Sequence, residues 1–171
     1  MQIYYSMISS PIGRIWVASD RVGVCLVRFG LGEEEFLGEI RKLGDINPLA
    51  DQQFNAGVLE EVTAYFEGRL TCFLSPVHLR GGAFDMKVWE AVKGIPFGET
   101  RSYQQIALQV GNPKGCRAVG RANGRNPVPL LIPCHRVIKK DGGLGGFSSG
   151  IEIKRWLLRF EREVSLSRQE R

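Results

Sequence analysis

Residues 102–124 read SYQQIALQVGNPKGCRAVGRANG, and this stretch decides the fold of the second half of the chain. Ser102 and Gln105 form the pattern of a capping box, which predicts a short helix that begins here and ends near Gly111. Asn112 and Pro113 predict a second helix that runs to the end of the stretch, because Asn caps helices and Pro fits their first turn. Two short helices joined by a turn that contains glycine are typical of a helix-turn-helix.

The second of these helices is expected to carry its positive charge on one face. Lys114, Arg117 and Arg121 recur at spacings of three and four residues, which brings side chains together on a helix. The remaining positions include several small residues, namely Gly115, Ala118, Gly120 and Ala122. Glycine destabilises a helix interior by about 1 kcal/mol relative to alanine, so this composition needs a reason. A close approach to DNA and tight packing against a neighbouring helix both supply one.

The charge balance changes sign along the chain. Residues 1–84 have a net charge of −3 and residues 85–171 have one of +8, within an overall charge of +5. Residues 100–140 contain eight basic residues and no acidic residue. A run of charge is often only a solvated surface, but a long basic stretch without acids also predicts a polyanionic partner such as DNA.

The first half of the chain has the pattern of a small α/β domain. β-Branched and aromatic residues between turn signals predict a meander of three antiparallel strands, over residues 3–8, 14–19 and 22–29. Apolar residues at helical spacing predict two helices, over residues 33–43 and 48–66, and an extended segment follows over residues 70–79. Arg80-Gly81-Gly82 is the expected boundary, which divides the chain into domains at residues 1–82 and 83–171.

The second domain is expected to add two more helices to the helix-turn-helix. One is predicted over residues 84–93, and the other is an amphipathic helix over residues 151–162 that buries Trp156 and Leu157. The polar tail beyond Val164 is expected to fray. Between these helices, Lys140-Asp141-Gly142-Gly143 is a turn of the kind that forms a wing, and a glycine-rich loop follows it.

The composition predicts a globular protein of the cytoplasm. Hydrophobic residues make up 43% of the chain and charged residues 24%, and no apolar run approaches the length that spans a membrane. The N-terminus lacks the basic start and apolar core of a secretory signal. We therefore expect an environment in which thiols stay reduced.

The cysteines do not have the spacing of a metal site. None of the four stands in a C-x-x-C pair, and the two histidines, His78 and His135, are far apart in the sequence. We therefore expect no bound metal. Cys25 and Cys72 lie in apolar runs and are expected to be small buried hydrophobic residues.

Cys134 has the neighbours of a nucleophile rather than those of a core thiol, in the segment Ile132-Pro133-Cys134-His135-Arg136-Val137. The thiolate is the reactive form of cysteine, and a nearby imidazole or cation promotes its formation. His135 is the expected base, and contact through a water is expected because adjacent side chains do not usually face each other. An acid of the final helix, such as Glu152 or Glu161, would orient the imidazole. These residues alone equally predict a cysteine hydrolase.

The segment from Val88 to Glu161 resembles the O6-alkylguanine-DNA alkyltransferases, also called methylated-DNA–protein-cysteine methyltransferases. The matching stretches occur in the order and at the spacing of the family: Phe97-Gly98-Glu99, Ser102-Tyr103-Gln104-Gln105, Gly111-Asn112-Pro113, Arg117-Ala118-Val119-Gly120, Asn126-Pro127-Val128-Pro129, Ile132–Val137 and Lys154–Leu158. The first half of the chain resembles the family only through Ser10-Pro11-Ile12-Gly13 and its strand pattern. The resemblance implies an N-terminal α/β domain of the ribonuclease-H-like kind with a small antiparallel sheet. It also implies an all-α winged helix-turn-helix C-terminal domain that binds DNA and accepts the alkyl group.

The resemblance implies a role for each residue of a catalytic site. Cys134 would accept the alkyl group irreversibly, so that each molecule acts once. His135 would take the thiol proton through a water, and Glu161 would orient the imidazole. Asn126 would hold the turn between the recognition helix and the active-site segment. Tyr103 would donate to the guanine ring as the alkyl group leaves, so that a neutral base departs.

The resemblance also implies a set of DNA-binding residues. Arg117 would fill the gap that a flipped-out nucleotide leaves in the base stack. Ser148 and its loop would close the pocket over the base. The recognition helix, which carries small side chains together with Ala118 and Arg121, would approach the minor groove closely. The positions that would touch the DNA backbone are Gln104, Asn112 and Lys140.

The expected partner is double-stranded DNA that contains O6-alkylguanine, with O4-alkylthymine as a second candidate substrate. The protein is expected to be a monomer that needs no cofactor and binds no membrane. Some members of the family hold a structural zinc, which the few cysteines and histidines here do not predict. Phe147 stands where some members have tyrosine, and Ser149 where glycine is common, so the range of substrates is left open.

Three other functions compete with alkyl transfer. A non-catalytic binder of DNA lesions would share the architecture, but relatives of that type lack the cysteine. A winged-helix transcription regulator would use Cys134 as a redox sensor and would bind undamaged duplex with sequence preference. A cysteine hydrolase would turn over repeatedly on an ester or amide.

Overall fold

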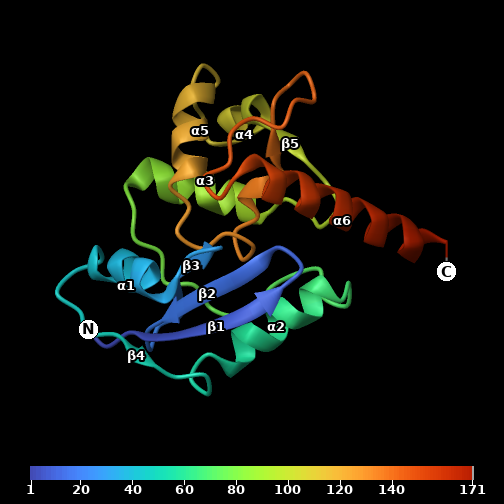
Figure 1. Ribbon diagram of the computed structural model, residues 1–171. Coiled ribbons are helices and arrows are strands. Elements are labelled where there is room, and N and C mark those ends of the chain that lie inside the picture. Colours follow the sequence, from blue (N-terminus) through green and yellow to red (C-terminus); the bar gives the residue numbers. More distant parts are fainter. Residues whose placement is uncertain (171) are drawn as a thin grey trace. The chain divides into compact units, whose positions relative to one another are not determined.

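The computed structural model describes residues 1–170, and the chain divides into two compact units, Met1–Leu79 and a second unit that begins at Arg80. Figure 1 shows the first unit as a small sheet with helices and the second as a group of helices. No helix within residues 1–170 is both long enough and apolar enough to cross a membrane.

The first unit is built on a four-stranded mixed sheet in the order β3-β2-β1-β4. As predicted, β1 (Tyr4–Ser10), β2 (Gly13–Ser19) and β3 (Val24–Phe29) form an antiparallel meander. The expectation of a purely antiparallel sheet was wrong, because β4 (Leu49–Ala50) pairs in parallel with β1. A strand of two residues is too short to show any hydrophobic alternation, so the sequence gives no sign of it.

Two helices accompany this sheet, α1 (Glu33–Arg41) and α2 (Ala56–Phe66). The helix predicted over residues 48–66 therefore begins eight residues late. The residues before it form β4 and a turn, in which the Asp51 carboxylate accepts a hydrogen bond of 2.9 Å from the backbone N–H of Phe54. Asp51 also accepts a bond of 2.7 Å through its carbonyl from Ser6 of β1. Side-chain and backbone bonds to a neighbouring strand thus override the helical pattern here.

The core of the first unit lies between α1 and the sheet. Trp16 of β2 stacks on Phe36 of α1 with ring centroids 5.4 Å apart, and Cys25 is buried in the same cluster. Cys72 is exposed, so the prediction that it is buried was wrong. Its apolar run is not a core segment, since the neighbouring Leu74 is 81% exposed.

The second unit contains four helices and one short pair of strands. The helices are α3 (Ala83–Lys93), α4 (Tyr103–Gln109), α5 (Cys116–Gly124) and α6 (Ile151–Gln169). The expectation of an all-α unit was wrong, because β5 (Arg101–Ser102) and β6 (Val137–Ile138) pair in parallel. This pair joins the start of α4 to the segment that follows Cys134. Such short strands again leave no pattern in the sequence.

The region of α4 and α5 follows the sequence with one correction. The capping box is confirmed, because Ser102 and Gln105 exchange side-chain-to-backbone bonds of 3.1 and 2.7 Å at the start of α4. The second helix, α5, begins at Cys116 and not at Asn112. Residues 112–115 form a turn instead, closed by a bond of 2.8 Å from the N–H of Gly115 to the carbonyl of Asn112. Lys114 therefore lies outside the helix.

Helices α3 and α6 frame this region. Trp89 of α3 is buried and its indole N–H donates 2.8 Å to the carbonyl of Ala122 in α5. Helix α6 extends to Gln169, so the frayed tail expected beyond Val164 was wrong within the described residues. Its buried positions are Lys154, Leu157 and Glu161, whereas Trp156 is only half-buried and stacks on Phe160. Two of the three innermost residues of this helix are thus charged.

Candidate active site

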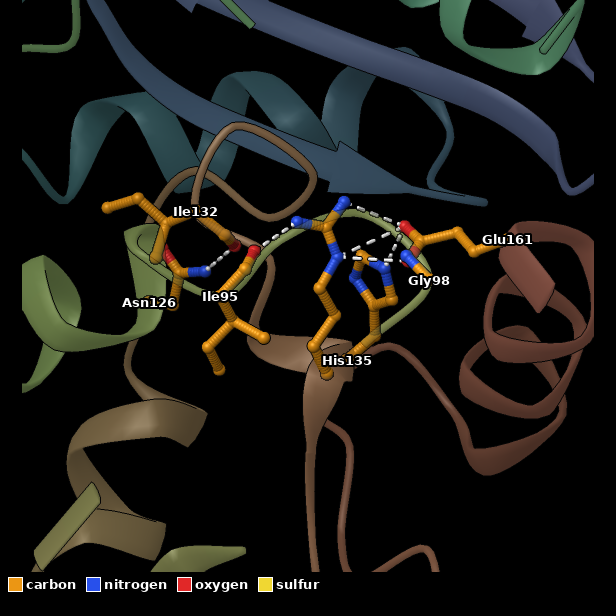
Figure 2. A network of polar contacts seen from close by, with 7 residues as sticks. Ile95, Gly98, Asn126, Ile132, His135 and Glu161 are labelled. Atoms are coloured by element: carbon orange, nitrogen blue, oxygen red, sulfur yellow. Dashed lines mark hydrogen bonds and ion pairs between the residues drawn. The ribbon is translucent and has the colours of Figure 1, made fainter. Parts of the chain in front are cut away.

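The segment that leads into Cys134 is held by one asparagine. The side-chain amide of Asn126 donates 2.8 Å to the carbonyl of Ile132 (Figure 2). The amide oxygen of Asn126 accepts 3.0 Å from the N–H of Val128. Between them the backbone of Leu130 has a φ of +74°, a conformation that a residue with a branched side chain rarely adopts. The tight loop delivers Cys134 to the start of a 3₁₀ turn, η1 (Cys134–Arg136), inside the unit.

Cys134 is almost fully enclosed, with 3% of its surface exposed. Burial raises the pKa of its thiol to about 11, against the opposing effects of a hydrogen bond from Asn126 and the positive charge of Lys154. The sulfur is therefore a protonated thiol at neutral pH. Its use as a nucleophile requires a base that removes the proton at the moment of reaction.

The neighbouring histidine belongs to a largely buried polar network, seen from close by in Figure 2. His135 Nε2 lies 2.7 Å from Glu161 Oε1. Arg136 donates to the same carboxylate through Nε at 2.9 Å and Nη2 at 2.9 Å, and through Nη1 to the carbonyl of Ile95 at 2.6 Å. The N–H of Gly98 adds a bond of 3.1 Å to Glu161 Oε2. His135 Nδ1 is buried and makes no hydrogen bond to the described residues.

The network sets the charge of both groups. Burial would raise the pKa of Glu161, but His135 and Arg136 hold it well below its ordinary range, so the carboxylate is charged. Burial lowers the pKa of His135, and the carboxylate of Glu161 opposes this only in part. The imidazole is therefore neutral at neutral pH and can accept a proton. The sequence left Glu152 as an alternative partner, but Glu152 is exposed and pairs with Arg155.

Two further side chains approach the thiol. Tyr103, at the first position of α4, is largely buried, and burial together with the nearby Cys134 raises the pKa of its phenol. Lys154 of α6 is completely buried and donates 2.6 Å to the carbonyl of Val137 and 3.4 Å to that of Gly146. Its ammonium lies 5.9 Å from the centre of the Tyr103 ring, and burial lowers its pKa to about 8.

Lys154 is the residue of the site that sequence reasoning missed. It occurred in a stretch that matched the family, but no role was attached to it. The available signal was its spacing, because residues 154, 157 and 161 fall at intervals of three and four on one helix face. A lysine in register with a buried leucine and a buried acid indicates a charge held inside the protein.

A pocket of about 680 Å³ opens beside α5. Its lining comes from α4, α5 and the glycine-rich loop, and includes Tyr103, Cys116, Arg117, Gly120, Arg121, Asn123, Phe147 and Ser148. Of the residues expected to bind DNA, Arg117, Arg121 and Ser148 thus lie together around one opening. Gly120 has no side chain, and a Cβ at this position would lie 3.8 Å from the Tyr103 ring. The glycine therefore leaves space in this wall of the pocket.

The other expected DNA-binding residues lie farther along the same region. Asn112 and Lys140 are exposed, in the turn before α5 and in the turn at residues 139–143, and Ala118 is half-buried on α5. Gln104 is engaged within the protein, since its amide donates 2.8 Å to the carbonyl of Pro113 and its oxygen accepts from Cys116 at 3.3 Å. No group of three metal-binding side chains occurs among residues 1–170.

The fold and the site define a two-unit protein in which a buried cysteine, histidine and glutamate stand beside a pocket on a basic helix. The profile of the ribonuclease-like domain of 6-O-methylguanine DNA methyltransferase matches residues 3–79, and that of its DNA binding domain matches residues 83–163. The chain belongs to the 6-O-methylguanine DNA methyltransferase family.

Individual relatives agree over nearly the whole length. The methylated-DNA–protein-cysteine methyltransferase of Methanosarcina acetivorans is 41% identical over 159 residues, which cover 93% of this chain and 98% of the relative. That of Mycobacterium tuberculosis is 41% identical over 160 residues, which cover 94% and 93%. The crystal structure of Mycobacterium tuberculosis OGT in complex with DNA matches with a TM-score of 0.81 at 39% identity and covers 94% of both chains.

Proposed function

We propose that this protein repairs DNA by moving an alkyl group from O6 of guanine to the sulfur of Cys134, once per molecule. The observation that carries this assignment is the hydrogen bond between His135 and Glu161, next to a thiol that is protonated at rest. Family membership supports the reaction class, since the relatives are named methylated-DNA–protein-cysteine methyltransferases.

The proposed reaction is a displacement at the alkyl carbon. His135 Nδ1 accepts the thiol proton through a water, while Nε2 stays bonded to Glu161. The sulfur then forms its bond to the alkyl carbon as the bond from that carbon to O6 breaks. Tyr103 donates its proton to the purine ring, so that guanine leaves as a neutral base, and the tyrosinate then regains a proton in exchange for the one that His135 took up from the thiol. The product is a thioether, which water does not readily hydrolyse, so the protein is consumed.

The proposed DNA complex uses α4 and α5 as a helix-turn-helix with the turn at residues 139–143 as its wing. An O6-alkyl carbon is inaccessible within the duplex, so the nucleotide must be flipped out at a cost of a few kcal/mol. The small side chains of α5 allow the helix to approach the minor groove closely. Arg117 fills the gap that the flipped nucleotide leaves in the base stack. Contacts to phosphates come from the exposed residues Asn112, Arg121 and Lys140. Gln104 supplies another contact through its backbone N–H, or through its side chain once the bonds to Pro113 and Cys116 are broken. Ala118 permits the close approach and Ser148 covers the flipped base.

The test is a peptide-mass experiment on the whole protein. The protein is incubated with a duplex that carries one O6-methylguanine, digested with trypsin and weighed. We expect one methyl group on the Cys134 peptide and an equal loss of O6-methylguanine from the DNA. The Cys134→Ser variant should take up no methyl group, whereas Cys116→Ser, which alters the cysteine that lines the pocket, should react like the wild type. Methylation of another residue, or repeated turnover, would contradict the proposal.

A further inference from the structure

One buried polar atom at the pocket is not used by the proposed mechanism. Asn123 lies on α5, is 5% exposed and is among the residues that line the pocket. Cys116 and Gly120 precede it on the same helix face at intervals that continue to Asn123, and they line the same pocket. The residue thus stands on the face of α5 that lines the pocket.

The orientation of the Asn123 amide is fixed by its partner. Its nitrogen donates 3.1 Å to the backbone carbonyl of Cys134, and only the NH₂ end of an amide can donate to a carbonyl. The other end, Oδ1, is therefore the acceptor. This oxygen is buried and makes no hydrogen bond to any of residues 1–170. A buried acceptor without a partner is unfavourable, and in the wall of a pocket a donor group of the ligand can complete it.

The chemistry of the damaged bases limits what that group can be. Alkylation at O6 removes the N1 proton of guanine but leaves the exocyclic 2-amino group as a hydrogen-bond donor. Alkylation at O4 removes the N3 proton of thymine, and no donor is left on that edge of the ring. A buried acceptor therefore suits O6-alkylguanine and offers O4-alkylthymine nothing.

The place of Asn123 matches this donor. O6 and the 2-amino group lie on one edge of guanine, separated by N1. A base whose alkyl carbon meets the sulfur of Cys134 therefore brings its 2-amino group close to the groups that surround this residue. Asn123 is bonded to that main chain at the Cys134 carbonyl.

We infer that Asn123 determines substrate specificity: its Oδ1 accepts a hydrogen bond from the 2-amino group of the flipped guanine. The inference rests on the proposed function and adds the base-selecting contact to it. Asn123 also has a structural role, since its hydrogen bond to the Cys134 carbonyl connects α5 to the segment that carries the nucleophile. The experiment must separate base selection from this structural bond.

The substrates that isolate the contact are two duplexes, one with O6-methylguanine and one with O6-methylhypoxanthine, which differ only in the 2-amino group. Rate constants for methyl transfer to Cys134 are measured for each. We expect the wild type to prefer O6-methylguanine by about tenfold or more, the size of effect that a site built to bind a donor shows against the analogue without it. Asn123→Leu and Asn123→Ala, which lack the acceptor, should bring the ratio close to one.

The control variant is Asn123→Asp, which keeps an acceptor oxygen but loses the amide donor, so that only its protonated form can still donate to the Cys134 carbonyl. It should react more slowly with both duplexes and still prefer O6-methylguanine. A purely structural role predicts the opposite, namely that every variant slows both reactions equally and keeps the wild-type ratio. A wild-type ratio close to one, or a full ratio in whichever of the Leu and Ala variants folds, would overturn the inference. Failure of the wild type to methylate Cys134 at all would instead refute the proposed function.

Discussion

Glu161 Oε1 lies 2.7 Å from His135 Nε2, and neither side chain has more than 1% of its surface exposed. Because a carboxylate accepts, Nε2 carries the ring proton, and the lone pair of the neutral imidazole is on Nδ1. The same carboxylate binds Arg136 and the N–H of Gly98. One acid of α6 therefore fixes the tautomer of the base and pins the 3₁₀ turn that carries the nucleophile.

Removal of this acid should destabilise the protein strongly. Glu161→Ala leaves Arg136 and His135 buried without their partner, which typically costs about 3–5 kcal/mol in the free energy of unfolding. Glu161→Gln keeps a hydrogen-bonding side chain and should cost less. Urea unfolding followed by circular dichroism measures both. The control is Glu152→Ala, an exposed acid of the same helix whose loss should change stability by less than about 0.5 kcal/mol. Equal losses of unfolding free energy at the two sites would show that the buried network does not stabilise the protein more than an exposed ion pair does.

The pH dependence of the reaction should be that of the histidine. Burial lowers the pKa of His135 below its ordinary 6.5, so the imidazole is neutral and ready to accept a proton at neutral pH. The rate of methyl transfer should therefore be flat around neutral pH and fall on acidification below about 6.5, as His135 becomes protonated. His135→Gln should remove this acid limb and slow the reaction by roughly 10²-fold or more. His78→Gln alters the other histidine, and its profile should follow the wild type. An acid limb that persists without His135 would assign the base elsewhere.

The sequence predicted what depends on local pattern and on side-chain chemistry. Three strands, the capping box at Ser102 and the Cys134-His135 pair were all readable, because each is encoded within a few residues. β4 and the β5–β6 pair were not, since two-residue strands exist only through partners distant in the chain. The start of α5 was misplaced for a related reason: Asn112 and Pro113 suit a helix start, but they were used by a turn that ends at Gly115.

The charged interior of the site was the hardest part to foresee. Amphipathicity predicts that the buried face of α6 is apolar, yet it holds Lys154 and Glu161. Each is stabilised by groups outside its own helix, which are the Val137 carbonyl for the lysine, and His135 and Arg136 for the glutamate. Periodicity marks a position as buried but does not say what it meets there.

Lys154 should support the reactivity of Cys134. At neutral pH its positive charge favours the thiolate, so Lys154→Met should lower the reactivity of the thiol at and below the lysine's own pKa of about 8 and slow methyl transfer. The variant also loses the bonds to Val137 and Gly146, which should loosen the loop over the pocket. The measurement is the pH dependence of carbamidomethylation at the Cys134 peptide. Arg155→Met removes an exposed cation of the same helix and should leave that dependence unchanged.

Arg117 should matter for duplex DNA and not for chemistry at the sulfur. It is exposed on α5 and lines the pocket opening, without a resolved contact to Cys134. Arg117→Ala should slow methyl transfer from O6-methylguanine in a duplex far more than benzyl transfer from free O6-benzylguanine, which needs no flipping. Rate constants for both substrates give the comparison. Equal losses on the two substrates would contradict a role in replacing the flipped nucleotide.

The loop over the pocket should tolerate no side chain at Gly145. A Cβ there would lie 2.6 Å from the hydroxyl oxygen of Tyr103, and the backbone φ of +72° already disfavours any residue but glycine. Gly145→Ala should therefore displace Tyr103 or the loop and slow methyl transfer. Gly142→Ala is the matched control, because Gly142 has a φ of +86° but no atom within 4 Å of its Cβ. Both variants carry backbone strain, so thermal melting should fall in both. Only Gly145→Ala should lose activity beyond that loss of stability, and similar rates for the two variants would show that the contact with Tyr103 has no part in the reaction.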